Sequence, residues 1–280
     1  GWDESWMQLP FAIGDALGRA ASGAAPGQTV TVPWPGYSRY LFYARLQGLN
    51  LQTVSSGLEG CLDVEAIVAT RPQLVMLASP NNPTGRLIPT HDLERLLDRV
   101  NGIVVVDEAY VEYAGRQHSL LHRTDEFDNL IVTRTFSKAF ALAGLRVGYA
   151  AANRDLIARL RRVKTPFNLN VLSEVAAVMA LRNCAWMYHA VEQTVSERAR
   201  LSGLLQAMNF FVYTSAANFV LVRSPVTPGL VVARLRECGI AVRAFGDAQW
   251  LESCVRFGVG KSEHTDRLVA ALRTIPEIVR

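Results

Sequence analysis

The chain has 280 residues, of which 50% are hydrophobic and 19% are charged, and its formal net charge is +4. This composition excludes an intrinsically disordered chain, which needs low hydrophobicity and high net charge. No stretch of 18 apolar residues occurs, so we expect no membrane partner, and the length predicts one large domain or two smaller ones.

The basic residues and the cysteines predict neither a nucleic-acid partner nor a metal site. Basic side chains are scattered, apart from a cluster at 159–164, whereas a nucleic-acid-binding surface needs a patch or stripe. The four cysteines lie far apart without zinc-binding spacing, so we expect free thiols and a cytoplasmic protein. The sequence opens on Gly1 with no signal-peptide pattern and no Met, which suggests a fragment or a processed form.

Helix-like and strand-like stretches alternate through the first 163 residues. In chain order they are a helix at 4–20, a strand at 29–33, a helix at 37–47, strands at 50–54 and 74–78, a helix at 91–100, strands at 103–106, 130–133 and 146–151, and a helix at 155–163. Residues 103–106 are all β-branched, which is typical of a strand buried on both faces. The alternation predicts an α/β fold with a mostly parallel central sheet flanked by helices.

The rest of the chain has a different pattern. One or two long helices are expected at 171–208, then strands at 210–213 and 219–223, a helix at 230–237, strands at 241–244 and 255–259, and a helix at 263–272. Asn170 is expected to cap the first of these helices. We therefore predict a large domain over 1–168, connecting helices over 170–208 and a smaller C-terminal α+β domain over 209–280.

Two segments that follow predicted strands carry polar side chains. Residues 78–85 read Ala-Ser-Pro-Asn-Asn-Pro-Thr-Gly, a turn-forming composition that places Asn82 where open α/β sheets bind ligands. Residues 103–110 end in Asp107 and Tyr110. A carboxylate at the end of a strand can hold a proton on a heteroaromatic nitrogen, but taken alone Asp107 is more simply a helix N-cap.

A third segment, at 133–140, contains Lys138 between apolar flanks. A lone lysine is usually a solvated surface charge. An apolar environment removes solvation and lowers the pKa of the amine, which then becomes a nucleophile for carbonyl groups. The chain has only three lysines, so one inside an apolar segment is a candidate catalytic residue.

Together these segments resemble the fold-type I aminotransferases that use pyridoxal 5′-phosphate (PLP), and the histidinol-phosphate aminotransferases in particular. The resemblance rests on SPNNPTG at 79–85, VVDEAYVEY at 105–113, RTFSKAFALAGLRVGY at 134–149, KTPFNLNVLSEVAA at 164–177 and ANFVLVR at 217–223, which occur in that family's order. It covers nearly the whole chain and implies the PLP-transferase fold and a homodimer. Family members carry a further N-terminal segment before the position of Gly1, which we expect to be missing here.

The resemblance also implies a role for each site residue. Lys138 would be the catalytic residue, bonded to PLP and moving the Cα proton of the substrate. The remaining cofactor residues would be Asp107 at the ring nitrogen, Tyr110 and Asn82 at the ring oxygen, Tyr37 on the ring face, and Arg146, Thr135, Ser137 and Asp3 around the phosphate. Arg256 and Arg243 would bind the acidic group of the substrate.

The implied reaction is transamination of histidinol phosphate with 2-oxoglutarate, as in histidine biosynthesis. Two alternatives keep the same cofactor residues: transamination of an aromatic amino acid, and PLP-dependent decarboxylation of a phosphorylated amino acid. A third alternative is a cofactor-binding remnant without activity, against which the full set of cofactor residues argues. An NAD-binding domain is not predicted, because no Gly-x-Gly-x-x-Gly motif follows an early strand.

Overall fold

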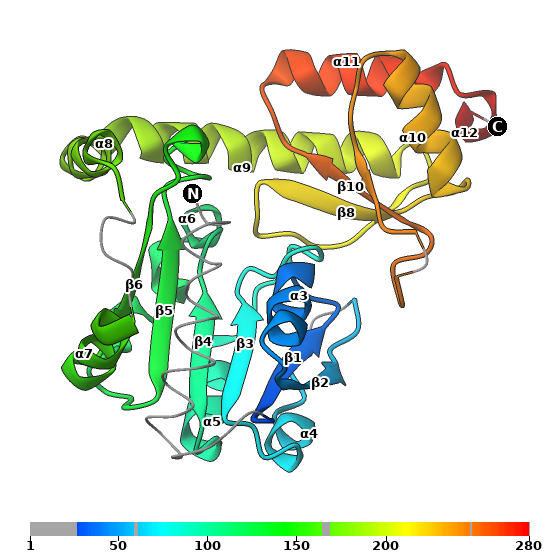
Figure 1. Ribbon diagram of the computed structural model, residues 1–280. Coiled ribbons are helices and arrows are strands. Elements are labelled where there is room, and N and C mark those ends of the chain that lie inside the picture. Colours follow the sequence, from blue (N-terminus) through cyan, green and yellow to red (C-terminus); the bar gives the residue numbers. More distant parts are fainter. Residues whose placement is uncertain (1–26, 59–60, 164–168, 247, 280) are drawn as a thin grey trace.

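The computed structural model describes residues 27–58, 61–163, 169–246 and 248–279. Over these residues the chain forms two sheets with a long helix running beside both (Figure 1). The helix predicted at 4–20 lies outside the described residues.

The larger sheet has six strands in the order β2-β1-β3-β4-β5-β6. These strands are β1 (Thr29–Trp34), β2 (Asn50–Ser55), β3 (Leu74–Ala78), β4 (Ile103–Asp107), β5 (Leu130–Thr135) and β6 (Gly148–Ala152). Neighbours from β2 to β5 are parallel, and β6 runs antiparallel to β5 at the edge. Every residue of β3 and β4 is buried, as expected for a parallel sheet covered on both faces. The predicted α/β fold with a mostly parallel sheet is confirmed.

Helices cover both faces of this sheet. Helices α3 (Ser38–Leu46) and α7 (Arg154–Val163) share one apolar core with it, and α4 (Val64–Ala69) and α5 (Thr90–Arg99) share the other. In α5, the buried residues Leu93, Leu96 and Leu97 recur at helical spacing and give the helix a single apolar side. A short helix, α6 (Val111–Ala114), follows β4 directly.

The smaller sheet is antiparallel, in the order β7-β8-β10-β9. Its strands are β7 (Phe211–Val212), β8 (Phe219–Arg223), β9 (Arg243–Ala244) and β10 (Cys254–Gly258). Helices α10 (Pro228–Glu237), α11 (Ser262–Arg273) and α12 (Pro276–Val279) complete this part of the chain. Buried side chains of α10, α11 and the two longest strands form one core, which includes Val231, Leu272 and Phe257.

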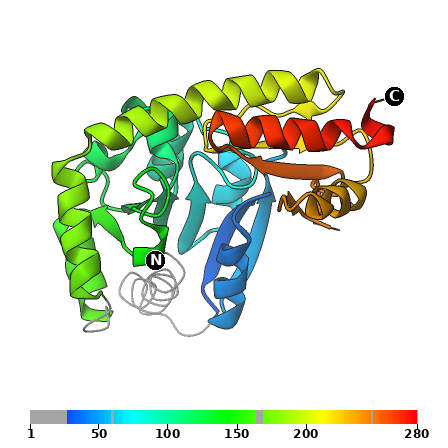
Figure 2. The same ribbon diagram turned by 90° about the horizontal axis from the view of Figure 1, so that it is seen from above.

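Two helices, α8 (Val171–Arg182) and α9 (Ala185–Gln206), connect the sheets. The Asn170 side chain accepts a hydrogen bond from the Ser173 N–H at 2.9 Å, so the predicted cap of α8 is confirmed. Near its start α9 contributes Met187 to a cluster beside the larger sheet, and near its end it contributes Leu205 to the core of the smaller sheet (Figure 2). The division of the chain into domains at 168 and 208 stays a prediction.

Candidate active site

The carboxyl ends of β3, β4 and β5 face the side of the molecule that carries the smaller sheet (Figure 1). The loops after these strands, together with β9 and β10, line two adjoining hollows of about 360 Å³ each. Six predicted site residues line them: Tyr110 and Lys138 the first, Tyr37 and Asn82 the second, and Arg243 and Arg256 both. The fold therefore brings together residues that lie far apart in the sequence.

Asp107 ends β4 and is only 7% exposed. Its Oδ2 accepts a hydrogen bond from the Tyr40 hydroxyl at 2.7 Å, and its Oδ1 accepts from the Ala109 N–H at 3.1 Å and the Thr133 hydroxyl at 3.4 Å. Burial raises the pKa of Asp107 to about 6, while these donors lower it. The carboxyl group is therefore ionised at neutral pH, as a partner for a protonated ring nitrogen must be. The N-cap of α6 is Tyr110, so the alternative role of Asp107 as a helix N-cap is wrong.

Tyr40 is a site residue that the sequence analysis missed. It lies on α3, is 2% exposed, and its ring centroid is 5.4 Å from that of Tyr37 in an edge-to-face arrangement. Burial, together with the nearby charge of Asp107, raises the pKa of the Tyr40 hydroxyl well above its usual value. The hydroxyl therefore keeps its proton and donates a hydrogen bond to the Asp107 carboxylate. The sequence does contain a sign of this role: Tyr40 lies three residues after Tyr37 at the start of a predicted helix. Residues three apart share a helix face, so the two rings could be expected on the same side.

Lys138 follows β5, and its Nζ lies 5.6 Å from the centroid of the Tyr110 ring. Phe136, Ala139 and Phe140 on either side are buried, but Lys138 itself is exposed. The expectation that these flanks desolvate the amine is therefore wrong: their side chains pack into the core and anchor the loop, while the lysine lines the open hollow. Burial raises the pKa of the neighbouring Tyr110, which stays protonated and able to donate.

The loop around Lys138 also contains the predicted phosphate-binding residues. The Thr135 hydroxyl is buried and accepts a hydrogen bond from the Ser137 N–H at 3.0 Å. The Ser137 hydroxyl is buried and has no hydrogen-bond partner among the described residues. An unpaired buried hydroxyl is unfavourable, so the Ser137 hydroxyl is available to an acceptor that the described residues do not supply. Arg146, later in the same loop, has left-handed backbone geometry with φ +52° and donates to the Ala143 carbonyl at 2.9 Å. Asp3 lies outside the described residues.

A hydrogen bond across the site joins the smaller sheet to the loop after β3. Arg256, on β10, donates from Nη1 to the Asn82 Oδ1 at 2.5 Å, and its guanidinium carbon lies 4.8 Å from the centroid of the Phe219 ring. Burial lowers the pKa of Arg256, and the nearby positive charge of Arg243 lowers it further. Arg243 is more exposed and has Phe245 beside it, at 5.8 Å from ring centroid to guanidinium carbon. The first arginine is thus held in place, and the second lies on the rim.

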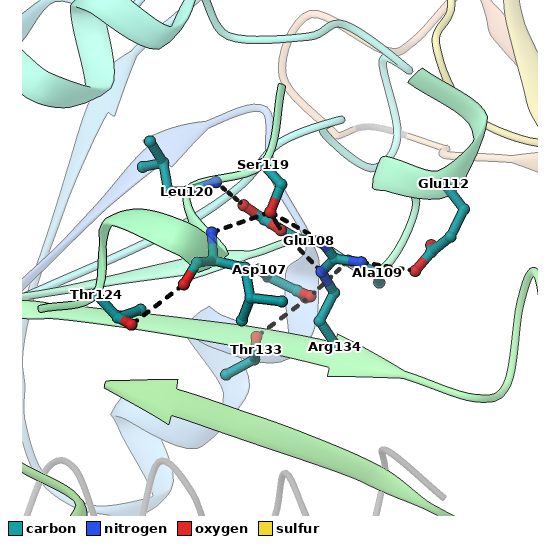
Figure 3. A network of polar contacts seen from close by, with 10 residues as sticks. Asp107, Glu108, Ala109, Glu112, Ser119, Leu120, Thr124, Thr133 and Arg134 are labelled. Carbon is teal, nitrogen blue, oxygen red and sulfur yellow. Dashed lines mark hydrogen bonds and ion pairs between the residues drawn. The ribbon is translucent and has the colours of Figure 1, made fainter. Parts of the chain in front are cut away.

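A buried polar network lies directly behind Asp107 (Figure 3). The Glu108 carboxylate is 1% exposed and accepts hydrogen bonds from the Ser119 hydroxyl at 2.7 Å, the Leu120 N–H at 2.6 Å and the Arg134 Nε at 2.8 Å. Arg134 also donates to Glu112 at 2.9 Å. The network fixes the turn after β4, and with it Asp107 and Tyr110. The sequence analysis did not find it, because its members come from three separate segments.

Comparison with known proteins shows the family of the chain. The family model described as aminotransferase class I and II matches residues 12–272 of the chain. A histidinol-phosphate aminotransferase of Caldanaerobacter subterraneus subsp. tengcongensis is 41% identical over 254 residues, which cover 89% of this chain and 71% of that protein.

Solved structures share the fold. The histidinol-phosphate aminotransferase from Sinorhizobium meliloti, solved in complex with pyridoxal-5′-phosphate, superposes with a TM-score of 0.82 at 25% identity, over 99% of this chain and 82% of that one. The L-threonine-O-3-phosphate decarboxylase from Porphyromonas gingivalis superposes with a TM-score of 0.81 at 24% identity, over 96% of this chain and 82% of that one. The second likeness concerns the fold alone. The predicted PLP-transferase fold is confirmed.

Proposed function

Because the chain belongs to the family of class I and II aminotransferases, we propose that it transfers an amino group from histidinol phosphate to 2-oxoglutarate. The observation that carries the choice of substrate is that Arg243 and Arg256 both line the hollows beside Lys138. A phosphate ester carries up to two negative charges, and guanidinium groups bind phosphate through several donors. Two arginines near the amine therefore favour a phosphorylated substrate over the single carboxylate of an aromatic amino acid.

PLP is the proposed cofactor, and the described residues fit it. The unpaired Ser137 hydroxyl suits a phosphate oxygen, the buried Asp107 carboxylate suits a protonated ring nitrogen, and the exposed Lys138 amine suits a carbonyl carbon. When bound, PLP supplies a ring that takes up the electron pair left by removal of the Cα proton. The family and the PLP complex of one neighbour support this choice.

The proposal gives each side chain a definite task. Lys138 would hold the cofactor through Nζ, and as a free amine it would accept the Cα proton of the substrate. Asp107 would hold the ring-nitrogen proton, Tyr110 and Asn82 would donate to the ring oxygen, and Tyr37 would cover the ring face. The phosphate would be bound by Thr135, Ser137, Arg146 and Asp3.

Tyr40 and Arg256 act on the same site from two sides. The hydroxyl of Tyr40 orients the Asp107 carboxylate and keeps it ionised, since a hydrogen bond to the charged form lowers the pKa. Arg256 binds the acidic group of the substrate while its contact with Asn82 holds the guanidinium in one orientation. A planar guanidinium held in this way binds an anion with less loss of side-chain freedom.

The proposal extends to assembly and location. We propose a homodimer, which the family implies, and a cytoplasmic protein, which the four free cysteines support. Among the described residues, no helix has the length and apolar content needed to cross a bilayer.

The first test is spectroscopic. The protein is loaded with PLP, freed of excess cofactor, and its absorbance is recorded before and after borohydride reduction. We expect a visible band that borohydride abolishes and that is absent in Lys138→Ala. Failure of the native protein to form the band would overturn the proposed cofactor.

The second test identifies the substrate. Histidinol phosphate is expected to abolish the visible band within one turnover, and phenylalanine is expected to do so poorly. Addition of 2-oxoglutarate is then expected to restore the visible band. The reverse preference would support the aromatic alternative. Release of carbon dioxide from a phosphorylated amino acid would support the decarboxylase alternative.

A further inference from the structure

The second hollow of the candidate site contains a third arginine, Arg39 on α3, which the sequence analysis did not single out. Arg243 and Arg256 line the same hollow from the smaller sheet, so guanidinium groups reach it from both parts of the fold. The described lining residues of the two hollows include no Asp and no Glu. Three positive charges around one space of about 360 Å³, without a carboxylate among these residues, attract an anion.

The side chain of Arg39 is held in a way that leaves it able to bind an anion. Its guanidinium carbon lies over the ring of Phe42, one helical turn later, at 5.5 Å from the ring centroid. A guanidinium over an aromatic face keeps its N–H donors, which lie in its own plane, available to other groups. Among the described residues no carboxylate pairs with Arg39, whereas Arg95 on α5 pairs with Glu65 at 2.6 Å. An anion can therefore bind Arg39 without displacing a described acidic residue.

The two hollows place the three arginines at increasing distance from the reacting amine. Lys138 lines only the first hollow, Arg243 and Arg256 line both, and Arg39 lines only the second. In the phosphate ester of an amino alcohol, the phosphorus lies three covalent bonds from the carbon that carries the amine. The carboxyl carbon of an amino acid lies one bond from that carbon. When the amine is held at Lys138, a phosphate therefore extends further towards Arg39 than a carboxylate does.

We propose that Arg39 completes a three-arginine subsite for the phosphate of the substrate and thereby selects phosphorylated amines. A phosphate monoester carries close to two negative charges at neutral pH and has three acceptor oxygens, which suits several guanidinium groups better than one. The choice of ligand rests on the proposed function. The presence of an anion subsite rests only on the residues that line the second hollow.

The first experiment measures selectivity for the phosphate group in the PLP-loaded protein. Loss of the visible band is followed at increasing concentrations of histidinol phosphate and of histidinol, which lacks the phosphate. Arg39→Gln is expected to raise the half-saturating concentration of histidinol phosphate about tenfold, because a charge-assisted contact is lost, and to leave that of histidinol within about twofold. An equal loss with both amines, or no loss with either, overturns the subsite.

Arg45→Gln is the matched control for this experiment. Arg45 is an exposed arginine on the same helix and is absent from the lining of either hollow. Its replacement removes the same charge from α3 and is expected to change neither half-saturating concentration. A tenfold rise in Arg45→Gln as well would assign the effect to the net charge of the protein and overturn the role of Arg39.

The second experiment needs no reaction, so it separates failure of the subsite from failure of the proposed function. Inorganic phosphate is titrated into the PLP-loaded protein and the heat of binding is recorded. Arg39→Gln is expected to weaken phosphate binding about fivefold or more, and Arg45→Gln to bind as the native protein does. No binding by the native protein, or an unchanged affinity in Arg39→Gln, overturns the subsite. Phosphate binding that depends on Arg39, in a protein that does not react with histidinol phosphate, supports the subsite and overturns the choice of substrate.

Discussion

Asp107 is a buried carboxylate, and its ionisation lowers the free energy of unfolding. Its pKa is about 6 in the folded protein, above the value near 3.9 of an unfolded chain. The folded state therefore binds the proton more tightly, so stability is greatest below the unfolded value and falls as the pH rises through 6. Above pH 7 the ionised group costs on the order of 3 kcal/mol, since one pKa unit is about 1.4 kcal/mol.

Asp107→Asn is therefore expected to stabilise the protein without cofactor. At pH 8 the free energy of unfolding should rise by about 2–3 kcal/mol, and the gain should shrink between pH 6 and pH 4 as the native carboxyl group takes up its proton. Urea unfolding of both proteins from pH 4 to pH 8 measures the difference. A loss of stability at pH 8 would show that the three donors to Asp107 outweigh its burial. PLP affinity should fall in the same variant, because an amide cannot neutralise the ring proton.

Tyr40→Phe removes one donor to Asp107 and leaves the ring in place. The pKa of Asp107 should then rise above 6, since the hydrogen bond from Tyr40 lowers it. The dissociation constant of PLP is expected to rise about tenfold at pH 6.5, and by less at pH 8.5, where the carboxyl group is ionised again. An absorbance titration at both pH values measures this. Tyr188→Phe, whose ring instead contacts Arg116, is the control and should not change the affinity.

The contrast between Lys138 and Tyr40 shows how far single residues can be predicted. Asn82, Asp107 and Lys138 were predicted because each lies at the end of a strand or a few residues after it, where the chain itself fixes their place near the sheet edge. Tyr40 touches Asp107 across 67 positions, a contact that depends on how α3 packs on the sheet. The exposure of Lys138 was misjudged for the same reason, because apolar neighbours along the chain need not surround a side chain in space.

At the scale of elements, the turn after β3 fits closely against the loop before β8. Gly85 has φ +76°, and a Cβ atom placed on it would lie 2.2 Å from the Ser215 hydroxyl oxygen. The Gly85 carbonyl also accepts a hydrogen bond from the Ala216 N–H at 2.7 Å. This turn carries Asn82, so its contact with the smaller sheet sets the position of a proposed cofactor residue.

Gly85→Ala should therefore destabilise the protein by about 2–4 kcal/mol, from the strained backbone and the clash together. Gly203→Ala, in the last turn of α9 with open space around the new methyl group, should instead stabilise it by about 0.5–1 kcal/mol. Urea unfolding of the two variants measures the change in the free energy of unfolding, which is expected to be negative for Gly85→Ala and positive for Gly203→Ala. Equal effects would contradict the close fit.

Element prediction succeeded where apolar periodicity was long and failed where elements were short. The strands β3 and β4 are continuous apolar runs, and their bounds were predicted within one residue. The six-residue helix α4 was missed because it is too short to show a helical period. Strand β9 was predicted at 241–244 but pairs only at Arg243–Ala244. The antiparallel direction of β6 depends on its connection, which apolar content does not encode.

At the scale of the whole molecule, the candidate site exists only between the two sheets. Arg256 comes from the smaller sheet and Asn82 from a loop of the larger one, and their hydrogen bond spans 174 positions. Helix α9 contributes buried side chains to clusters beside both sheets. An anion bound at Arg256 should therefore stabilise both parts of the fold.

Inorganic phosphate is accordingly expected to raise the Tm of the PLP-loaded protein. At 20 mM phosphate the increase should be about 3 °C or more, because a ligand that binds only the native state stabilises it. Arg256→Gln should reduce the increase to less than half. Arg223→Gln, an exposed arginine on the neighbouring strand, should retain it. An equal increase in all three proteins would place the phosphate elsewhere.

The hydrogen bond between Arg256 and Asn82 also has a consequence for how the chain is made. A ribosome adds about 5–20 residues per second, so roughly 10–45 s separate the synthesis of Tyr37 from that of Arg256. Every strand of the larger sheet is complete by Ala152, long before β10 exists. From the completion of Ala152 until Arg243 is added, the nascent protein contains Lys138 and Asp107 but neither Arg243 nor Arg256, which are proposed to bind the substrate. A chain released between Ala152 and Arg243 would therefore contain every strand of the larger sheet and neither of these two arginines for a phosphorylated amine.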